Sequence, residues 1–167
     1  MDIQLRKWNE HDIDSLVSNA NSQNLTTYLR NSFPFPYTRD CAKSFIDFCT
    51  QTSSSHNYAI TINDIAIGNI SLDFCTDIKS HSAELGYWIG EDYWNKGYVT
   101  LALQKLIQLY ASDKTLKRIF AEVVTLNVGS IRVLEKNGFI NEGTFKKSIY
   151  KNNILYDSYL YSLLLEE

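Results

Sequence analysis

A short loop that contains Lys96 and Gly97 joins two segments of different character. The preceding segment, from Glu84 to Ile89, is apolar and aromatic like a strand, and the segment from Val99 onward has the periodicity of a helix. The first N–H groups of a helix lack partners within that helix, and the helix dipole places about half a positive charge at the same end. A glycine-containing loop between a strand and a helix therefore predicts a site for phosphate.

The composition restricts the classes of protein that this chain can belong to. Its 167 residues, 44% hydrophobic and 21% charged, predict a single globular domain, residues 1–167, with a substantial core. The net charge of −3 gives no general attraction to nucleic acid or to anionic membranes, so neither is expected as a partner. No apolar run approaches the ~20 residues of a membrane-spanning helix, and the N-terminus lacks the layout of a signal peptide. We therefore expect a cytoplasmic protein.

The cysteines and histidines show no spacing that indicates a reactive or metal-binding site. Cys41, Cys49 and Cys75 lack a CxxC arrangement and are interpreted as reduced, buried thiols. A catalytic cysteine is disfavoured, because nothing near these residues in the sequence would lower a thiol pKa. A metal site is not expected, because no histidine has ligand spacing with Cys, Asp or Glu. The histidines are His11, His56 and His81.

The hydrophobic pattern predicts the elements that must position the loop. Strands are expected at 3–6, 58–62, 65–74, 82–89 and 117–126, with a final hairpin of 144–150 and 154–165. Helices are expected after the capping residues Asn9, Thr38 and Asn127, over 25–30, and from Val99 to Tyr110. Strand, helix and strand in succession from residue 82 to residue 126 imply a right-handed crossover and a parallel strand pair. The fold class is therefore α+β, with a parallel pair inside an otherwise antiparallel sheet.

The segment 31–38 contains Pro34 and Pro36 and cannot form a regular helix. Phe33, Phe35 and Tyr37 alternate with these prolines. One interpretation is a stiff connector whose aromatic rings fill the core. The other is a rigid aromatic lip over a ligand pocket.

Two motifs in this order resemble the GNAT superfamily of N-acetyltransferases, and within it the branch of ribosomal-protein N-terminal acetyltransferases. The first runs from Ala83 to Thr100, and the second is Asn127-Val-Gly-Ser-Ile-Arg-Val-Leu-Glu-Lys-Asn-Gly-Phe139. The family's phosphate loop has the pattern Gln/Arg-x-x-Gly-x-Gly/Ala. Here Gly97 matches this pattern, while Trp94 and Val99 depart from it. The resemblance covers essentially the whole chain, because the predicted order of elements is also the GNAT order.

The resemblance implies acetyl-CoA as a co-substrate, with no metal. It implies a splayed parallel pair, helices on both faces of the sheet, and a pantetheine arm on the backbone of the strand after Glu84. That backbone segment consists of Tyr87, Trp88 and Ile89. The pyrophosphate would be held by backbone N–H groups of the loop and helix start, which are Asn95, Lys96, Gly97, Tyr98, Val99 and Thr100. Asn127, Ser130 and Arg132 would lie at the cofactor arm.

Acyl transfer to an amine requires a base for the ammonium proton and an acid for the leaving thiolate. Many GNAT members place a tyrosine acid where this chain has Leu134, so the resemblance leaves Ser130 as the acid. A serine that only satisfies a backbone group in the first helical turn is the alternative. Glu84 is the expected base, acting through water, and a carboxylate on the solvent side of a strand is its alternative.

The expected reaction is direct transfer of acetyl from acetyl-CoA to a primary amine, either a protein N-terminal α-amine or a small-molecule amine. The competing hypothesis is a non-catalytic module that binds or senses acyl-CoA. A module for another nucleotide is disfavoured, because the longer glycine-rich loop of such proteins is missing. No motif identifies the acceptor, and the sequence leaves monomer and homodimer open.

Overall fold

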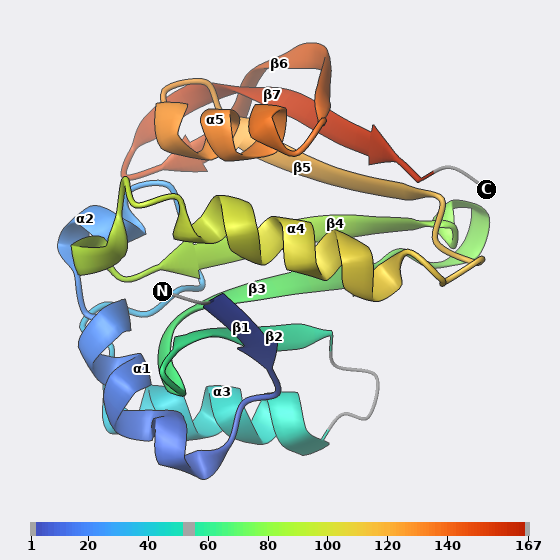
Figure 1. The fold of residues 1–167 in the computed structure, drawn as a ribbon. Coiled ribbons are helices and arrows are strands. Elements are labelled where there is room, and N and C mark those ends of the chain that lie inside the picture. Colours follow the sequence, from blue (N-terminus) through green and yellow to red (C-terminus); the bar gives the residue numbers. More distant parts are fainter. Residues whose placement is uncertain (1–2, 52–55, 166–167) are drawn as a thin grey trace. The chain divides into compact units, whose positions relative to one another are not determined.

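The computed structural model describes residues 3–51 and 56–165, and the strands of these residues form one sheet of seven strands (Figure 1). Across the sheet the order is β1 (Ile3–Arg6), β2 (Asn57–Ile62), β3 (Ile65–Phe74), β4 (Ser82–Ile89), β5 (Arg118–Val124), β7 (Ile154–Leu164) and β6 (Ile140–Lys151). The β4–β5 pair is parallel, whereas the pairs β1–β2, β2–β3, β5–β7 and β6–β7 are antiparallel. The predicted α+β fold with one parallel pair is confirmed.

The α-helices lie between β1 and β2, between β4 and β5, and between β5 and β6, as the hydrophobic pattern predicts. The α-helices are α1 (Ile13–Ala20), α2 (Gln23–Thr26), α3 (Arg39–Gln51), α4 (Tyr98–Tyr110) and α5 (Val128–Lys136). Short 3-10 turns are η1 (Glu10–Asp12), η2 (Asp77–Lys79) and η3 (Glu91–Tyr93). Within residues 3–51 and 56–165, no helix has both the length and the apolar character needed to cross a membrane.

Local side-chain chemistry sets several of these boundaries. Asn63 and Asp64 join β2 to β3 with φ values of 49° and 65°, the left-handed conformation that a two-residue hairpin turn requires. Asn127 caps α5, since its side chain accepts a hydrogen bond from the N–H of Ser130. Gly138 follows α5 with φ 80°, the left-handed conformation that commonly ends a helix. The predicted cap at Asn127 and the predicted connection between strands 58–62 and 65–74 are confirmed.

Two predicted boundaries are wrong. The helix expected over 25–30 is α2 and spans Gln23–Thr26, because Ser22 caps it by accepting the N–H of Leu25. The strand expected from residue 144 begins earlier, at Ile140. Most of β6 is exposed, so its sequence carries little of the apolar alternation by which strands are recognised.

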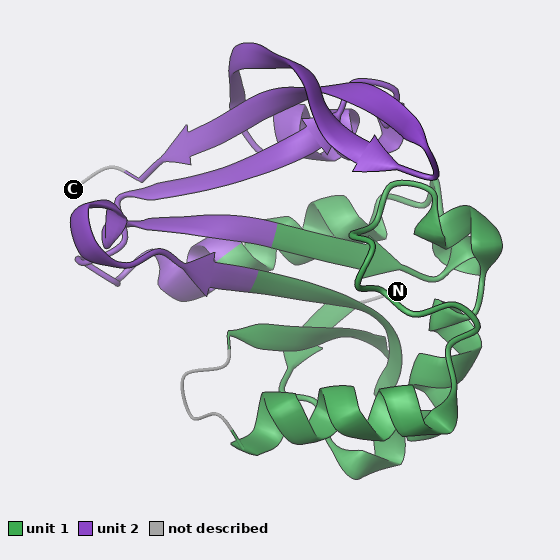
Figure 2. Cartoon of the chain, turned by 180° about the vertical axis from the view of Figure 1, so that it is seen from behind, with its two compact units in different colours: residues 1–71, 86–106 green, residues 72–85, 107–167 purple. Residues whose placement is uncertain are grey.

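The chain forms two compact units (Figure 2). The first unit contains residues 1–71 and 86–106, and the second contains residues 72–85 and 107–167. The boundary falls within β3, β4 and α4, so each of these elements has one part in each unit.

In the first unit, α1 and α3 pack on a core that includes residues of β2 and β3. Its buried members are Trp8, Leu16, Ala20, Tyr37, Ala42, Ile46, Cys49, Ala59 and Ala66. The part of α4 in this unit lies in front of the sheet in Figure 1, whereas α3 is in front when the sheet is seen from behind in Figure 2. Helices therefore lie on both faces of the sheet, as the resemblance implies.

Tyr37 is 4% exposed, and Phe33 contacts it with ring centroids 5.2 Å apart. The core-filling interpretation of segment 31–38 is confirmed for these two rings. Phe35 is 49% exposed and does not share their burial.

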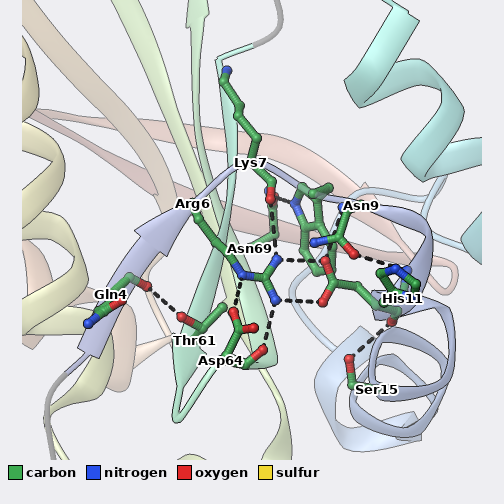
Figure 3. Close-up of polar contacts among 11 residues, drawn as sticks. Gln4, Arg6, Lys7, Asn9, His11, Ser15, Thr61, Asp64 and Asn69 are labelled. Carbon is green, nitrogen blue, oxygen red and sulfur yellow. Dashed lines mark hydrogen bonds and ion pairs between the residues drawn. The ribbon is translucent and has the colours of Figure 1, made fainter.

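A partly buried ion pair between Arg6 and Asp12 ties β1 to the start of α1 (Figure 3). Arg6 donates to both carboxylate oxygens of Asp12, at 2.7 and 2.8 Å, and Asp12 is 3% exposed. Asp12 also accepts the N–H of Asn9 at 3.1 Å, which completes a capping box. Arg6 in addition bonds the carboxylate and the backbone oxygen of Asp64 in the β2–β3 turn. The charges are thus paired where they are buried, which is the condition for tolerating them there.

The second unit presents two chemically different faces around β5. Every second residue along β5 and this unit's part of β4 faces α5 and is buried. On this face, the hydroxyl of Tyr161 donates to the carboxylate of Glu135 in α5 at 2.9 Å. The buried residues are Ala83, Leu85, Ile119, Ala121, Val123, Leu134 and Tyr161. The intervening residues point the other way, since successive side chains of a strand alternate between faces. That opposite face carries Glu84, Phe120, Glu122, Ser158 and Ser162.

Candidate functional site

The loop between η3 and α4 has the backbone that an anion site requires. Asn95 and Gly97 both have positive φ, 59° and 78°, so the chain changes direction sharply on either side of Lys96. The N–H of Leu101 donates to the carbonyl of Gly97 at 3.1 Å, so Gly97 is the N-cap residue and α4 begins at Tyr98. In an α-helix the N–H groups before that first bond point beyond the N-terminus, together with the positive end of the dipole. The start of α4 thus directs backbone N–H groups away from the helix.

Gly97 leaves open space beside this backbone. A Cβ atom built on Gly97 meets no atom of the described residues within 4 Å. Packing therefore does not require glycine here, whereas the positive φ does, because other residues reach that conformation at a cost. Open space next to a glycine backbone lets a ligand approach closely.

Three contacts hold the loop in place. The indole Nε1 of Trp94 donates to the carbonyl of Ile89, the last residue of β4, at 2.9 Å. The backbone N–H of Trp94 donates to Glu91 at 3.1 Å. The Nζ of Lys96 lies 5.8 Å from the centre of the Tyr93 ring, a cation–π distance. Lys96 therefore rests over an aromatic ring of the preceding turn.

Glu91 joins this loop to α2, which the sequence did not reveal. Its carboxylate accepts hydrogen bonds from the Ser22 hydroxyl and from Asn24 Nδ2, the latter at 2.7 Å. The bond from Ser22 and then the bond from Asn24 lower the pKa of Glu91. Since Ser22 is the cap of α2, the start of that helix and the turn before the loop share one carboxylate.

The end of β4 is closely packed against β3. The N–H of Gly90 donates to Ile67 at 2.8 Å. A Cβ built on Gly68 would lie 2.3 Å from the carbonyl oxygen of Trp88, so only glycine permits this approach. Trp88 also contacts Phe33 edge to face, with centroids 5.7 Å apart. The predicted contact residues of the strand and the loop, residues 87–89 and 95–100, all lie in the first unit.

The remaining predicted site residues lie in the second unit. Asn127 and Ser130 are brought together by the cap at 3.2 Å, and Arg132 is exposed on α5. Leu134 is fully buried, so this position belongs to the core of the second unit. Glu84 is half-buried and pairs with Phe120, and β4 continues to Ile89 after this last recorded pair with β5.

Glu122 is a candidate residue that the sequence reasoning missed. It lies two residues after Phe120 on β5 and therefore shares the face of Glu84. The hydroxyl of Ser158, which is completely buried, donates to Glu122 Oε1 at 2.5 Å and lies 2.6 Å from the Ser148 hydroxyl. The position of a charged residue among the apolar residues of the strand predicted over 117–126 could have identified it.

Ser148 belongs to a bulge in β6, between the pairs Phe145↔Ser158 and Ile149↔Tyr156. Lys147 within the bulge has φ 52°. Such bulges redirect a side chain, and here the redirected residue is the one that reaches Ser158.

One interpretation of the cysteines needs correction. Cys49 is buried, but Cys41 and Cys75 are only half-buried. The hydroxyl of Thr38 lies 3.2 Å from the Cys41 sulfur and lowers the pKa of that thiol. The lowered pKa comes from the predicted capping residue Thr38 rather than from a charged neighbour.

Comparison with known proteins assigns this chain to a family. The model of the acetyltransferase (GNAT) domain matches residues 2–140, and the chain belongs to this family. An uncharacterized N-acetyltransferase of Bacillus licheniformis, p20, is 30% identical over 99% of this chain and 94% of its own length. The ribosomal-protein-serine acetyltransferase of Escherichia coli is 33% identical over 65% of this chain and 60% of its own.

A solved structure of the microcin C7 self-immunity acetyltransferase MccE, in complex with acetyl-CoA and AMP, is similar with a TM-score of 0.83. It is 27% identical and covers 98% of this chain and 92% of its own. The resemblance to GNAT acetyltransferases, including ribosomal-protein acetyltransferases, is thereby confirmed.

Proposed function

We propose that this protein transfers an acetyl group from acetyl-CoA to a primary amine, either a protein N-terminal α-amine or a small-molecule amine. The observation that carries the proposal is the start of α4, where left-handed Asn95 and Gly97 and the open space beside Gly97 fit a pyrophosphate. The structure of MccE with acetyl-CoA, a protein 27% identical to this chain, supports the same ligand.

Each predicted residue then has a role in binding. The backbone N–H groups of residues 95–100 bind the pyrophosphate, and Lys96 adds a positive charge close to it. The backbone of Tyr87, Trp88 and Ile89 binds the amides of the pantetheine arm. The family resemblance adds Asn127 and Arg132 as residues expected at the cofactor arm.

Bound acetyl-CoA supplies the thioester carbonyl that the amine attacks. Glu84 and Glu122 share one face of the second unit and accept the proton of the ammonium, directly or through water. A terminal α-amine, with a pKa near ~8, asks less of such a base than a lysine amine near ~10.4. Ser130, at the start of α5, donates a proton to the sulfur as the carbon–sulfur bond breaks, and the proton that the attacking nitrogen loses restores the Ser130 hydroxyl.

A module that binds acyl-CoA without transferring the acyl group is the second candidate. The observation that favours it is the complete burial of Leu134, at the position where many family members carry their tyrosine acid. On this hypothesis the loop binds ligand and Ser130 only completes the first turn of α5.

A single experiment separates the two candidates. The full chain is incubated with acetyl-CoA and a panel of amines and short peptides, and the release of thiol and the acetylated products are measured. Binding of CoA is measured separately by calorimetry. Release of thiol with an equal amount of acetylated amine supports the transferase. Binding without release in the whole panel supports the sensing module, and the absence of binding overturns both.

A further inference from the structure

The indole of Trp94 bridges the two ends of the turn that precedes α4. Its Nε1 donates to the carbonyl of Ile89 at 2.9 Å, and an indole N–H can only donate. Ile89 is 6% exposed and is the last residue of β4. Trp94 itself is 37% exposed, so a large part of its ring lies outside the core.

This hydrogen bond closes the turn formed by residues 89–94. Within the turn, the N–H of Tyr93 donates to the carbonyl of Gly90 at 2.9 Å, and the N–H of Trp94 donates to the carbonyl of Glu91 at 3.1 Å. The N–H of Gly90 is bonded to β3, through Ile67 at 2.8 Å. The turn from Ile89 to Trp94 is therefore fixed at its start, in its middle and at its end, and Asn95 leaves it in the left-handed conformation.

The turn of residues 89–94 separates the two backbone segments that are proposed to bind CoA. In the sequence, residues 87–89 come immediately before it and residues 95–100 immediately after it. A ligand that uses both segments binds tightly only if their separation is already correct in the free protein, because the second contact then forms within one complex.

We propose that Trp94 is a positioning residue for CoA, whose indole N–H fixes the distance between the pantetheine-binding strand and the pyrophosphate loop. This inference rests on the proposed function. What the position requires is a side-chain N–H donor for the Ile89 carbonyl rather than an aromatic ring. Glutamine and arginine side chains also carry N–H donors, so either can supply the same bond.

The proposal differs from a simple packing role in its predictions. If the ring acted by packing, Trp94→Phe would be harmless and Trp94→Gln harmful. If the N–H acts, the order is reversed, because phenylalanine keeps the aromatic ring and loses the donor. The chain offers a matched control in Trp8, whose Nε1 donates to Asn69 at 2.9 Å in the core of the same unit.

The experiment measures the affinity of the full chain and its variants for two probes by calorimetry. The first probe is CoA, and the second is adenosine 3′-phosphate 5′-diphosphate, which has the pyrophosphate and lacks the pantetheine arm. Trp94→Phe is expected to weaken CoA binding about tenfold and the shorter probe by less than about threefold. Trp94→Gln is expected to bind CoA with an affinity within about threefold of that of the wild type. Trp8→Phe is expected to lower the Tm without a selective loss of affinity for CoA.

Each other outcome is informative. Unchanged CoA binding in Trp94→Phe, or an equal loss of both probes, overturns the positioning role while the acetyltransferase proposal stands. A wild-type protein that binds neither probe overturns both. Circular dichroism and Tm identify a variant that does not fold. If a Trp94 variant does not fold, hydrogen exchange is measured on a folded Trp94→Arg variant instead. Faster exchange of the amides of residues 95–100 than in the wild type overturns the claim that any N–H donor suffices.

Discussion

The hydroxyl of Ser158 donates a hydrogen bond of 2.5 Å to Oε1 of Glu122, and it joins β7 to β5 on the face that also carries Glu84. Ser158 is completely buried and is itself within 2.6 Å of Ser148 in the β6 bulge. A carboxylate in this position has one oxygen held by a fixed donor. It is therefore oriented before any substrate arrives, which is the condition under which a general base acts well.

Replacing Ser158 by alanine is expected to lower kcat several-fold and leave the KM for acetyl-CoA unchanged, because Glu122 loses the donor that orients it. The matched control is Ser162→Ala. Ser162 lies on the same strand and face, is 4% exposed, and donates to Glu142 at 2.6 Å rather than to Glu122. Steady-state kinetics with a reactive amine compares the two variants. Equal losses of kcat would mean that Ser158 acts only through stability.

Glu84→Gln and Glu122→Gln are expected to lower kcat by about tenfold or more each, with little change in the affinity for CoA, because an amide cannot accept the ammonium proton. The double variant shows whether the two carboxylates act together. If they share one proton, its loss of activity is smaller than the product of the single losses. Wild-type rates in both single variants would contradict the assignment of Glu84 and Glu122 as general bases.

Ser130→Ala is expected to reduce turnover by about tenfold while the Tm changes little. The hydrogen bond from Ser130 to the Asn127 side chain uses the backbone N–H of Ser130, which alanine retains. Asn127→Ala instead removes the cap of α5 and is expected to cost about 1 kcal/mol of stability. Thermal unfolding and single-turnover rates separate these effects. A loss of stability in Ser130→Ala equal to that in Asn127→Ala would favour the purely structural role.

The predictability of the fold from the sequence depended on local chemistry. The turn at Asn63 and Asp64 and the end of α5 at Gly138 follow from residues that tolerate positive φ, and both are where the sequence predicts them. The first residues of β6 lack this kind of signal. They lie on an exposed strand, so neither alternation nor capping marks their start.

Only the part of the candidate site that consists of backbone groups could be predicted from the sequence. The loop around Gly97 is recognised by its residue types, because a strand, a glycine and a helix start are sufficient to define it. The bridge from Trp94 to Ile89, the carboxylate of Glu91 at α2, and the serine that holds Glu122 are contacts between side chains and distant or buried partners. No spacing in the sequence encodes them.

Gly97→Ala is expected to weaken CoA binding by about tenfold or more, because a Cβ would enter the space beside the loop and alanine at φ 78° costs about 1 kcal/mol or more. Gly97→Asn tests the two causes separately. Asparagine accepts a positive φ more readily than alanine, so it should recover stability and still obstruct the ligand. Calorimetry with CoA and a thermal melt are measured on each variant. Wild-type affinity in Gly97→Ala would show that no ligand approaches this backbone.

The ion pair of Arg118 and Glu142 in the second unit predicts how stability responds to acid. The Arg118 guanidinium bonds both oxygens of Glu142 and, with the Ser162 hydroxyl, holds the pKa of Glu142 at about 2, below its ordinary value of 4.5. Because the folded-state pKa is the lower one, the pair stabilises the fold fully above pH 4.5 and loses this effect as the pH falls from 4.5 toward 2.

Glu142→Gln is therefore expected to lower the Tm at neutral pH and to make the Tm fall less steeply than that of the wild type between about pH 5 and about pH 3. The effect is modest, because the Glu142 side chain is 37% exposed and water screens the pair. Thermal melts in 1 M salt serve as the control, since screening by salt should bring the wild-type slope toward that of the variant. Parallel Tm curves for the two proteins at low salt would contradict a stabilising role for this ion pair.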